Sequence, residues 1–203
     1  KLDNIGPKKT YNGVEYNKKL SLKCRSVANY IIEEINKYNK YKSVREKVFL
    51  STKRLQKLIY FCEVEYMKRN NGKPLFDDEY YAWKNGPSIP GLYYLFMQYA
   101  DGNINPVYEK GEQELSEDVK IIIDEILDAT KNLDTVDLTN ISNVSGSPYD
   151  KVFNEDDEHH EQLISKKDIC NYYVNKNLML QLKNNDLGCL DQDQIIKLKD
   201  KTL

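Results

Sequence analysis

Histidine is the side chain best suited to acid–base and metal chemistry near neutral pH, and it occurs here only as the adjacent pair His159-His160. The pair lies within the acidic stretch 155–161, whose carboxylates could bind a divalent ion together with an imidazole. Side chains of neighbouring residues seldom converge on one ion, and this spacing matches no common metal site. The pattern therefore favours a solvated acidic loop over a metal centre.

Motifs for catalysis and cofactor binding are missing from the sequence. Neither of the glycine-rich loops that cradle phosphates, G-x-x-x-x-G-K-[ST] and G-x-G-x-x-G, is present. The G-x-S-x-G elbow and the H-E-x-x-H pair are missing as well. A general base would have to come from the histidine pair or from scattered carboxylates. We therefore expect a protein that is not an enzyme and that holds no metal or cofactor.

Basic residues recur along one apolar-patterned segment, where they could contact phosphates. They are Lys53, Arg54, Lys57, Lys68 and Arg69. Such a run is more often the solvated side of an amphipathic helix. The 30 Lys and Arg residues nearly balance 32 Asp and Glu, which gives a net charge of −2 and no electrostatic footprint for DNA or RNA. Nucleic acid is therefore disfavoured as a partner.

The segment that follows Trp83 is unusual for a loop. It contains Gly86, Pro87, Pro90 and Tyr93, so its backbone is restrained and loses little entropy on folding or binding. Trp and Tyr are frequent anchors at protein interfaces. A large aromatic side chain is also commonly buried for structural reasons. The sequence leaves both roles open for Trp83: an interface anchor, or a core plug next to the start of a helix.

The elements that position these residues are expected to be mostly helical, from apolar residues at helical spacing and from capping residues. The sequence predicts helices over residues 23–39, 51–69, 90–99, 116–127, 135–143 and 165–173. Ser51 or Thr52 can cap the second of these, and Ser116 the fourth, because their hydroxyls accept from free amides of the first turn. The fourth has the clearest apolar stripe, at positions i, i+3, i+4, i+7 and i+8 from Val119.

A few short strands complete the expected fold. The pair Asn12-Gly13 indicates a hairpin turn, and residues 80–83 and 106–108 are candidate strands. Residues 1–22 are interpreted as an N-terminal arm, and residues 177–203 differ enough in character to be a C-terminal extension. The predicted fold is mainly α: a compact single helical domain of about six helices, residues 23–176, with a few short strands and two extensions.

Composition restricts the setting of the protein. The longest apolar runs are far shorter than the roughly 18 residues of a membrane-spanning helix, so no membrane partner is expected. The start, Lys1-Leu2-Asp3, does not resemble a secretion signal, which makes a cytoplasmic location the expectation. The four cysteines show no C-x-x-C spacing, so we expect reduced thiols.

The sequence resembles a known family, the Panacea domain, which is the SocA-like antitoxin domain also found in phage-associated GepA-type proteins. The likeness begins at residues 27–32 and continues through 51–61, which include Lys57 and Tyr60. It is strongest at Ala82-Trp83-Lys84-Asn85-Gly86-Pro87-Ser88-Ile89-Pro90, with Tyr93 following. Residues 115–117 and 164–169 are similar to later helix starts of the family.

The sequence departs from the family pattern at one place. The family often has a Thr-His pair before a Pro-Trp, whereas the nearest stretch here is Ser142-Asn143 followed by Pro148-Tyr149. Any role of that histidine is therefore not supplied by this chain.

The resemblance implies a function as well as a fold. It implies an antitoxin of a toxin–antitoxin pair that neutralises its toxin by direct protein–protein binding, with Lys57, Tyr60 and the Trp83–Tyr93 segment as its motif residues. Alternatives are an adaptor that delivers the toxin to a protease, and a DNA-binding autoregulator of its own operon. The cognate toxin is the expected partner, a protease is a second candidate, and a homo-oligomer is left open.

Overall fold

The computed structural model describes residues 9–11, 14–16, 20–104, 113–157 and 162–187. The candidate strand at 106–108, the Asn12-Gly13 turn and the His159-His160 pair lie outside these residues. So do Cys189 and most of the tail. Of the other cysteines, Cys24, Cys62 and Cys170 are free thiols. No helix in the described ranges is long and apolar enough to cross a membrane.

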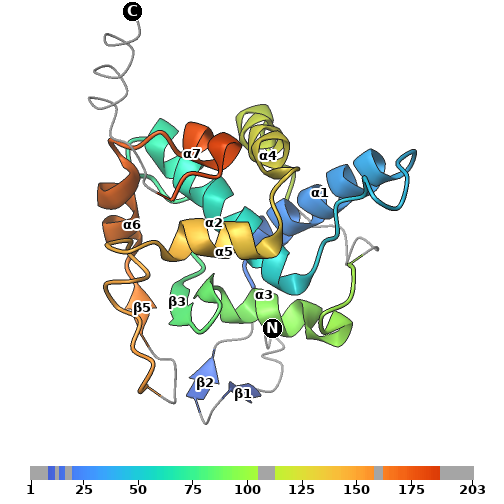
Figure 1. Cartoon of the computed structure of the whole chain (residues 1–203). Coiled ribbons are helices and arrows are strands. Elements are labelled where there is room, and N and C mark those ends of the chain that lie inside the picture. Colours follow the sequence, from blue (N-terminus) through green and yellow to red (C-terminus); the bar gives the residue numbers. More distant parts are fainter. Residues whose placement is uncertain (1–8, 12–13, 17–19, 105–112, 158–161, 188–203) are drawn as a thin grey trace, which may run out of the picture.

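The mainly helical fold predicted from the sequence is confirmed (Figure 1). The described residues form α1 (Leu22–Asn39), α2 (Thr52–Arg69), α3 (Pro90–Phe96), the 3-10 turn η1 (Met97–Tyr99), α4 (Glu117–Thr130), α5 (Thr135–Asn143), α6 (Lys166–Tyr173) and α7 (Leu178–Asn184). Each helix predicted between residues 23 and 173 is therefore present, although Ser116, the predicted cap of α4, makes no side-chain capping hydrogen bond. Ser51 caps α2 by accepting a hydrogen bond from Arg54 N, and Ser165 caps α6 by accepting from Asp168 N.

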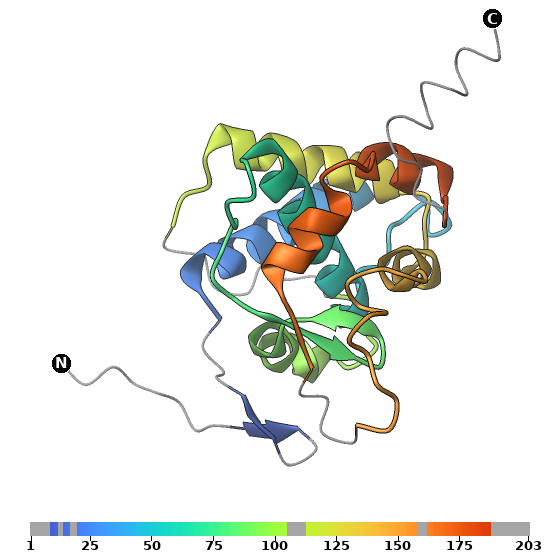
Figure 2. The same ribbon diagram turned by 90° about the vertical axis from the view of Figure 1, so that its left-hand side faces the viewer.

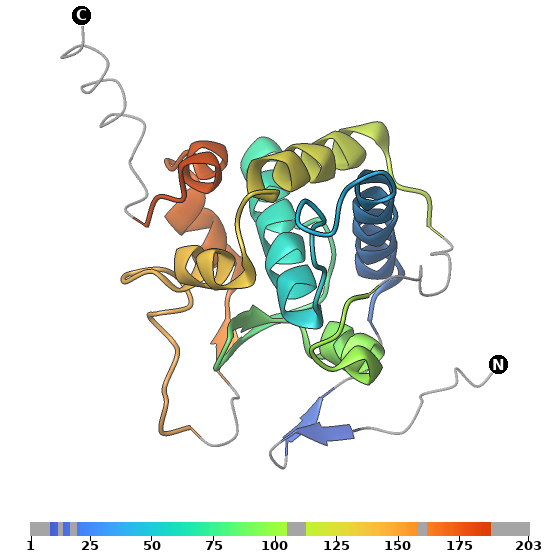
Figure 3. The same cartoon turned by 45° about the vertical axis from the view of Figure 1, so that its right-hand side comes forward.

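Helix α2 is the centre of the domain. It contacts α1, α3, α4, α5, α6 and strand β4, and Figure 3 shows it (teal) enclosed by other helices. As a result it is buried on nearly all sides rather than along one stripe. Its enclosed surface includes polar side chains, so the interior must provide these with partners.

A small sheet covers one end of α2 (Figure 2). Strands β3 (Tyr80–Trp83), β4 (Gly86–Ser88) and β5 (Leu163–Ile164) pair antiparallel in the order β4-β3-β5. Trp83 pairs with Gly86, so only Lys84 and Asn85 form the turn of the β3–β4 hairpin. Pro87 is tolerated in β4 because this strand lies at the edge of the sheet.

The segments near the two ends of the chain differ in how they join the domain. The predicted N-terminal hairpin is present as β1 (Lys9–Tyr11) paired with β2 (Val14–Tyr16). Leu20 is already part of the core, and Ser21 caps α1. At the other end, α7 contacts α4, and its Leu178 and Leu182 are fully buried in the same core. Residues on both sides of the predicted domain limits thus pack with the domain.

Candidate functional site

Residues that the sequence analysis places in the family motif meet at one pocket. Lys57 comes from α2, Trp83 from β3 and Tyr93 from α3, and together with neighbouring residues they line a cavity of about 360 Å³. The Lys84-Asn85 turn and Ser88 of the hairpin also line it. The pocket is therefore built where the β3–β4 hairpin and α3 pack on the N-terminal half of α2.

The side chain of Gln56 fixes this arrangement. Its Nε2 donates a hydrogen bond to Ile89 O at 2.9 Å, and its Oε1 accepts one from Ile89 N at 2.9 Å. The amide thus pairs with both backbone groups of Ile89, as a neighbouring strand would. The hairpin and the start of α3 are held on α2 by this contact, so the pocket is preformed.

Trp83 and Tyr93 form the aromatic wall of the pocket. Their ring centroids lie 5.4 Å apart with an interplanar angle of 79°, an edge-to-face geometry that is favourable for aromatic pairs. Trp83 is only 7% exposed, as expected of a core plug, and yet it lines the pocket. Tyr93 is half-buried. The two roles left open for Trp83 are therefore compatible.

Lys57 is the most unusual group in the pocket. It is 1% exposed, and its Nζ makes one long contact, 3.4 Å to Pro87 O. An ammonium group has three donors, and a distance of 3.4 Å is beyond the usual range for such a bond. No carboxylate in the described part of the chain forms an ion pair with it. Burial alone lowers the pKa of Lys57 to about 7.

Gly86 is needed because Lys57 and α5 approach it closely. A Cβ atom at this position would lie 2.5 Å from Lys57 Nζ and 2.5 Å from Asn143 Oδ1. Its φ of +99° is also rarely adopted by residues with a side chain. Asn143, whose Oδ1 accepts a hydrogen bond from Ser142 Oγ at 2.8 Å, thereby joins the site from the end of α5.

We expect Gly86→Ala to lower the free energy of unfolding by about 3 kcal/mol, because it combines backbone strain with two close contacts. Gly146→Ala is the matched control, since Gly146 has φ +80° and an added Cβ there would meet no atom within 4 Å. Urea denaturation of both variants measures the difference. Equal losses would show that only the backbone angle matters and that Lys57 and Asn143 do not restrict the site.

The remaining motif residues are structural. Pro87 and Pro90 are buried in β4 and in the first turn of α3. Tyr60 is fully buried and does not line the pocket; its ring packs edge-on against Tyr80 at 5.2 Å and against Tyr173 at 6.4 Å. The geometry therefore brings Lys57, Trp83, Gly86 and Tyr93 together and leaves Tyr60 in the core.

The predicted solvated basic face of α2 is wrong for Arg54 and Lys57. Arg54 is 4% exposed and donates to Leu133 O at 2.6 Å and Thr130 O at 3.0 Å, and Lys57 is buried in the pocket. Lys53 pairs with Asp101, and Lys68 and Arg69 both pair with Glu65. The cause is that α2 is enclosed on nearly all sides, so its charges face protein groups. Lys53 and Arg69 remain exposed, whereas Arg54 and Lys57 are buried, so the five residues do not form one continuous solvated face.

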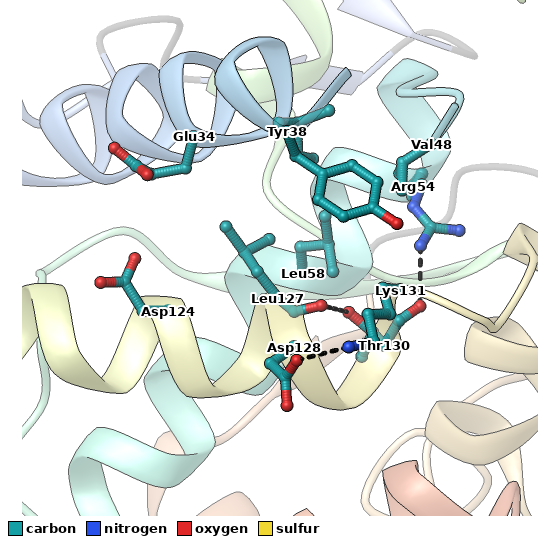
Figure 4. A pocket seen from close by; sticks show the side chains of 11 residues that line it. Glu34, Tyr38, Val48, Arg54, Leu58, Asp124, Leu127, Asp128, Thr130 and Lys131 are labelled. Carbon is teal, nitrogen blue, oxygen red and sulfur yellow. Dashed lines mark hydrogen bonds and ion pairs between the residues drawn. The ribbon is translucent and has the colours of Figure 1, made fainter. Parts of the chain in front are cut away.

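A second hollow, of about 260 Å³, lies between α1, α2 and α4 (Figure 4). Each of its charged side chains has at least one partner within the protein. Asp128 pairs with Lys131 at 2.8 Å, and Asp124 accepts from Tyr30 Oη at 3.2 Å. Glu34 pairs with Lys37, and Arg54 is held by the carbonyl groups at the end of α4. Arg54 Nε is the one buried charged-group atom of this lining that has no hydrogen-bond partner among the described residues, while the two other nitrogens of its guanidinium group are held by Leu133 O and Thr130 O.

The metal chemistry considered for the histidine pair finds no counterpart in the described residues. Among them there is no group of three or more His, Cys, Asp or Glu side chains that could hold a metal ion. The acidic stretch around the histidine pair remains a sequence-based prediction, because the pair itself lies outside the described ranges.

The fold and the pocket define a small helical domain built around a central helix with a buried lysine. Comparison with known families is consistent with this class: residues 55–148 match the family model described as Antitoxin SocA-like, Panacea domain. This segment runs from α2 to the loop after α5 and includes Lys57, Trp83, Gly86, Tyr93 and Asn143. The resemblance to the Panacea domain is thereby confirmed over these residues. No curated protein and no solved structure matches the chain.

Proposed function

We propose that the protein is an antitoxin that neutralises a cognate toxin by binding it directly, without catalysis. The family match indicates an antitoxin role in general terms. The observation that supports binding is the preformed pocket, in which the family-motif residues Lys57, Trp83 and Tyr93 converge. A half-buried tyrosine and a tryptophan that line a pocket, beside a buried amine with only one long contact, are a suitable surface for a protein partner.

Co-expression tests this function. A neighbouring gene that arrests growth when expressed alone is expected to be tolerated when the antitoxin is co-expressed, and the two purified proteins are expected to form a complex. Toxin abundance in the rescued cells separates two mechanisms. Constant toxin levels support direct neutralisation, whereas loss of the toxin would indicate delivery to a protease. Failure of every neighbouring gene to show relief would contradict the antitoxin function itself.

We expect Trp83→Ala to weaken the complex by about 2 kcal/mol, roughly 30-fold in Kd, because it removes the larger of the two rings in the aromatic wall of the pocket. Isothermal titration with the purified toxin measures this change, and circular dichroism verifies that the variant is folded. Trp83→Phe retains an aromatic ring and serves as the variant for which folding is least at risk. Val136→Ala is the control, because Val136 is 65% exposed on α5 and does not line the pocket. Unchanged affinity in a folded Trp83→Ala variant would exclude this pocket from the interface.

A further inference from the structure

The side chains that line the pocket beside Lys57 carry more positive than negative charge. Three lysines line it, Lys53, Lys57 and Lys84, against the single carboxylate of Asp101. That carboxylate is occupied, since Asp101 pairs with Lys53 at 3.2 Å. Lys84 is exposed at the turn of the hairpin. The excess positive charge therefore lies on Lys57, which is buried at the floor of the pocket, and on Lys84, which is exposed at its rim.

Burial of an unpaired lysine is unfavourable for the fold. Removing an ammonium group from water without a counter-ion is among the most costly ways to bury a side chain. Two other buried charged groups of this protein have close polar partners. Arg54 donates hydrogen bonds to two carbonyl groups, and Glu63 forms an ion pair with Lys166. Lys57, by contrast, has a single long contact. The missing partner is most simply supplied by an incoming anion.

We propose that this pocket receives a carboxylate side chain of the bound partner, with the Lys57 ammonium group as its counter-ion. The inference rests on the antitoxin function proposed above and specifies the chemistry of the toxin surface. The Trp83–Tyr93 wall covers the methylene groups of that acidic side chain, and the neighbouring Lys84 adds to the attraction at the rim. A carboxylate in this position satisfies donors that the protein leaves unused.

Trp83 provides a direct probe, because it is the single tryptophan of the chain and lines the pocket. The full-length protein is titrated with 3-phenylpropionate and, in parallel, with the uncharged analogue 3-phenylpropionamide, while Trp83 emission is recorded. We expect a saturable change with the acid and at least tenfold weaker binding of the amide. Equal binding of acid and amide would overturn the proposal. Tighter binding of phenyl phosphate than of the acid would overturn it in favour of a phosphoryl ligand.

Lys57→Met keeps the length of the side chain and removes its charge. We expect this variant to lose the preference for the acid over the amide and to lose toxin neutralisation. Lys131→Met is the control, because Lys131 is paired with Asp128 and lines the other hollow. If Lys57→Met still neutralises the toxin, the carboxylate site is wrong while the antitoxin function stands. If the wild type binds the acid but relieves no toxin, the antitoxin function is wrong, and with it the assignment of the carboxylate to a toxin.

Discussion

Replacing Lys166 by Met is expected to lower the free energy of unfolding by about 3–5 kcal/mol, because it leaves the buried carboxylate of Glu63 without its counter-ion. Glu63 is 0% exposed, and its Oε1 lies 2.7 Å from Lys166 Nζ. The ammonium group also donates to Phe76 O and lies 4.9 Å from the centroid of the Phe76 ring. Lys166 thus connects α6 to α2 and to the segment before β3, so its loss loosens three parts of the core. Urea denaturation at neutral pH measures the effect.

The pH dependence of this variant provides an independent check. Burial raises the pKa of Glu63 above that of an ordinary carboxyl group, and Lys166 opposes that rise. Without Lys166 the folded carboxyl group holds its proton to higher pH than the unfolded chain does. Stability is therefore lost as pH rises above the unfolded pKa of about 4.3. The deficit relative to wild type should be smaller at pH 4.5 than at pH 7.5.

An exposed ion pair provides the control. Lys120 pairs with Glu117 at 2.8 Å on the surface of α4, where the Glu117 side chain is 81% exposed. Solvent screens such a pair, so Lys120→Met should change stability by less than about 1 kcal/mol. If Lys166→Met were as mild as Lys120→Met, the Glu63–Lys166 pair would have no special structural importance.

Local sequence patterns predict the helices of this protein but not the partners of its buried charges. The helices could be predicted because they carry local signals, such as Ser51 as the cap of α2 and the apolar stripe of α4 that begins at Val119. The partners of buried charges have no local signal. Lys166 and Glu63 are 103 residues apart, and Arg54 and Leu133 are 79 apart. The prediction of a solvated face on α2 failed for Arg54 and Lys57 for this reason, since periodicity reveals one apolar face but not how many elements cover the others.

For the candidate site, the sequence could predict the motif residues but not their arrangement in space. Strand β4 was not expected, because Gly86 and Pro87 disfavour an isolated strand and only pairing with β3 makes one. Lys57, Trp83 and Tyr93 belong to the family motif, but nothing in the sequence shows that they share a pocket. In the sequence, Asn143 marks only a departure from the family pattern. Its place beside Gly86 depends on how α5 packs against β4, which is a tertiary property.

Lys57→Met is expected to make the protein more stable while abolishing its function. Burial lowers the pKa of Lys57 to about 7, whereas the unfolded side chain titrates near 10.4. Between these values the unfolded chain binds the proton and the folded protein does not. The wild type therefore gains stability as pH rises from 7 to about 10, by about 1.4 kcal/mol for each pH unit at most. Below pH 7 Lys57 is protonated in both the folded and the unfolded protein, so the full free-energy cost of burying its charge remains.

A methionine at this position has no charge to bury. The free energy of unfolding of the variant should therefore exceed that of the wild type by the largest margin at pH 7 and by a smaller margin at pH 10. Denaturation curves at pH 7, 8.5 and 10 measure this convergence, and Lys131→Met, whose lysine is exposed and paired, should show little of it in this range. A parallel stability difference at all three pH values would mean that Lys57 is not buried as an uncompensated base. A variant that is more stable but no longer neutralises the toxin would separate binding from folding, because the lost function could not then be attributed to a damaged fold.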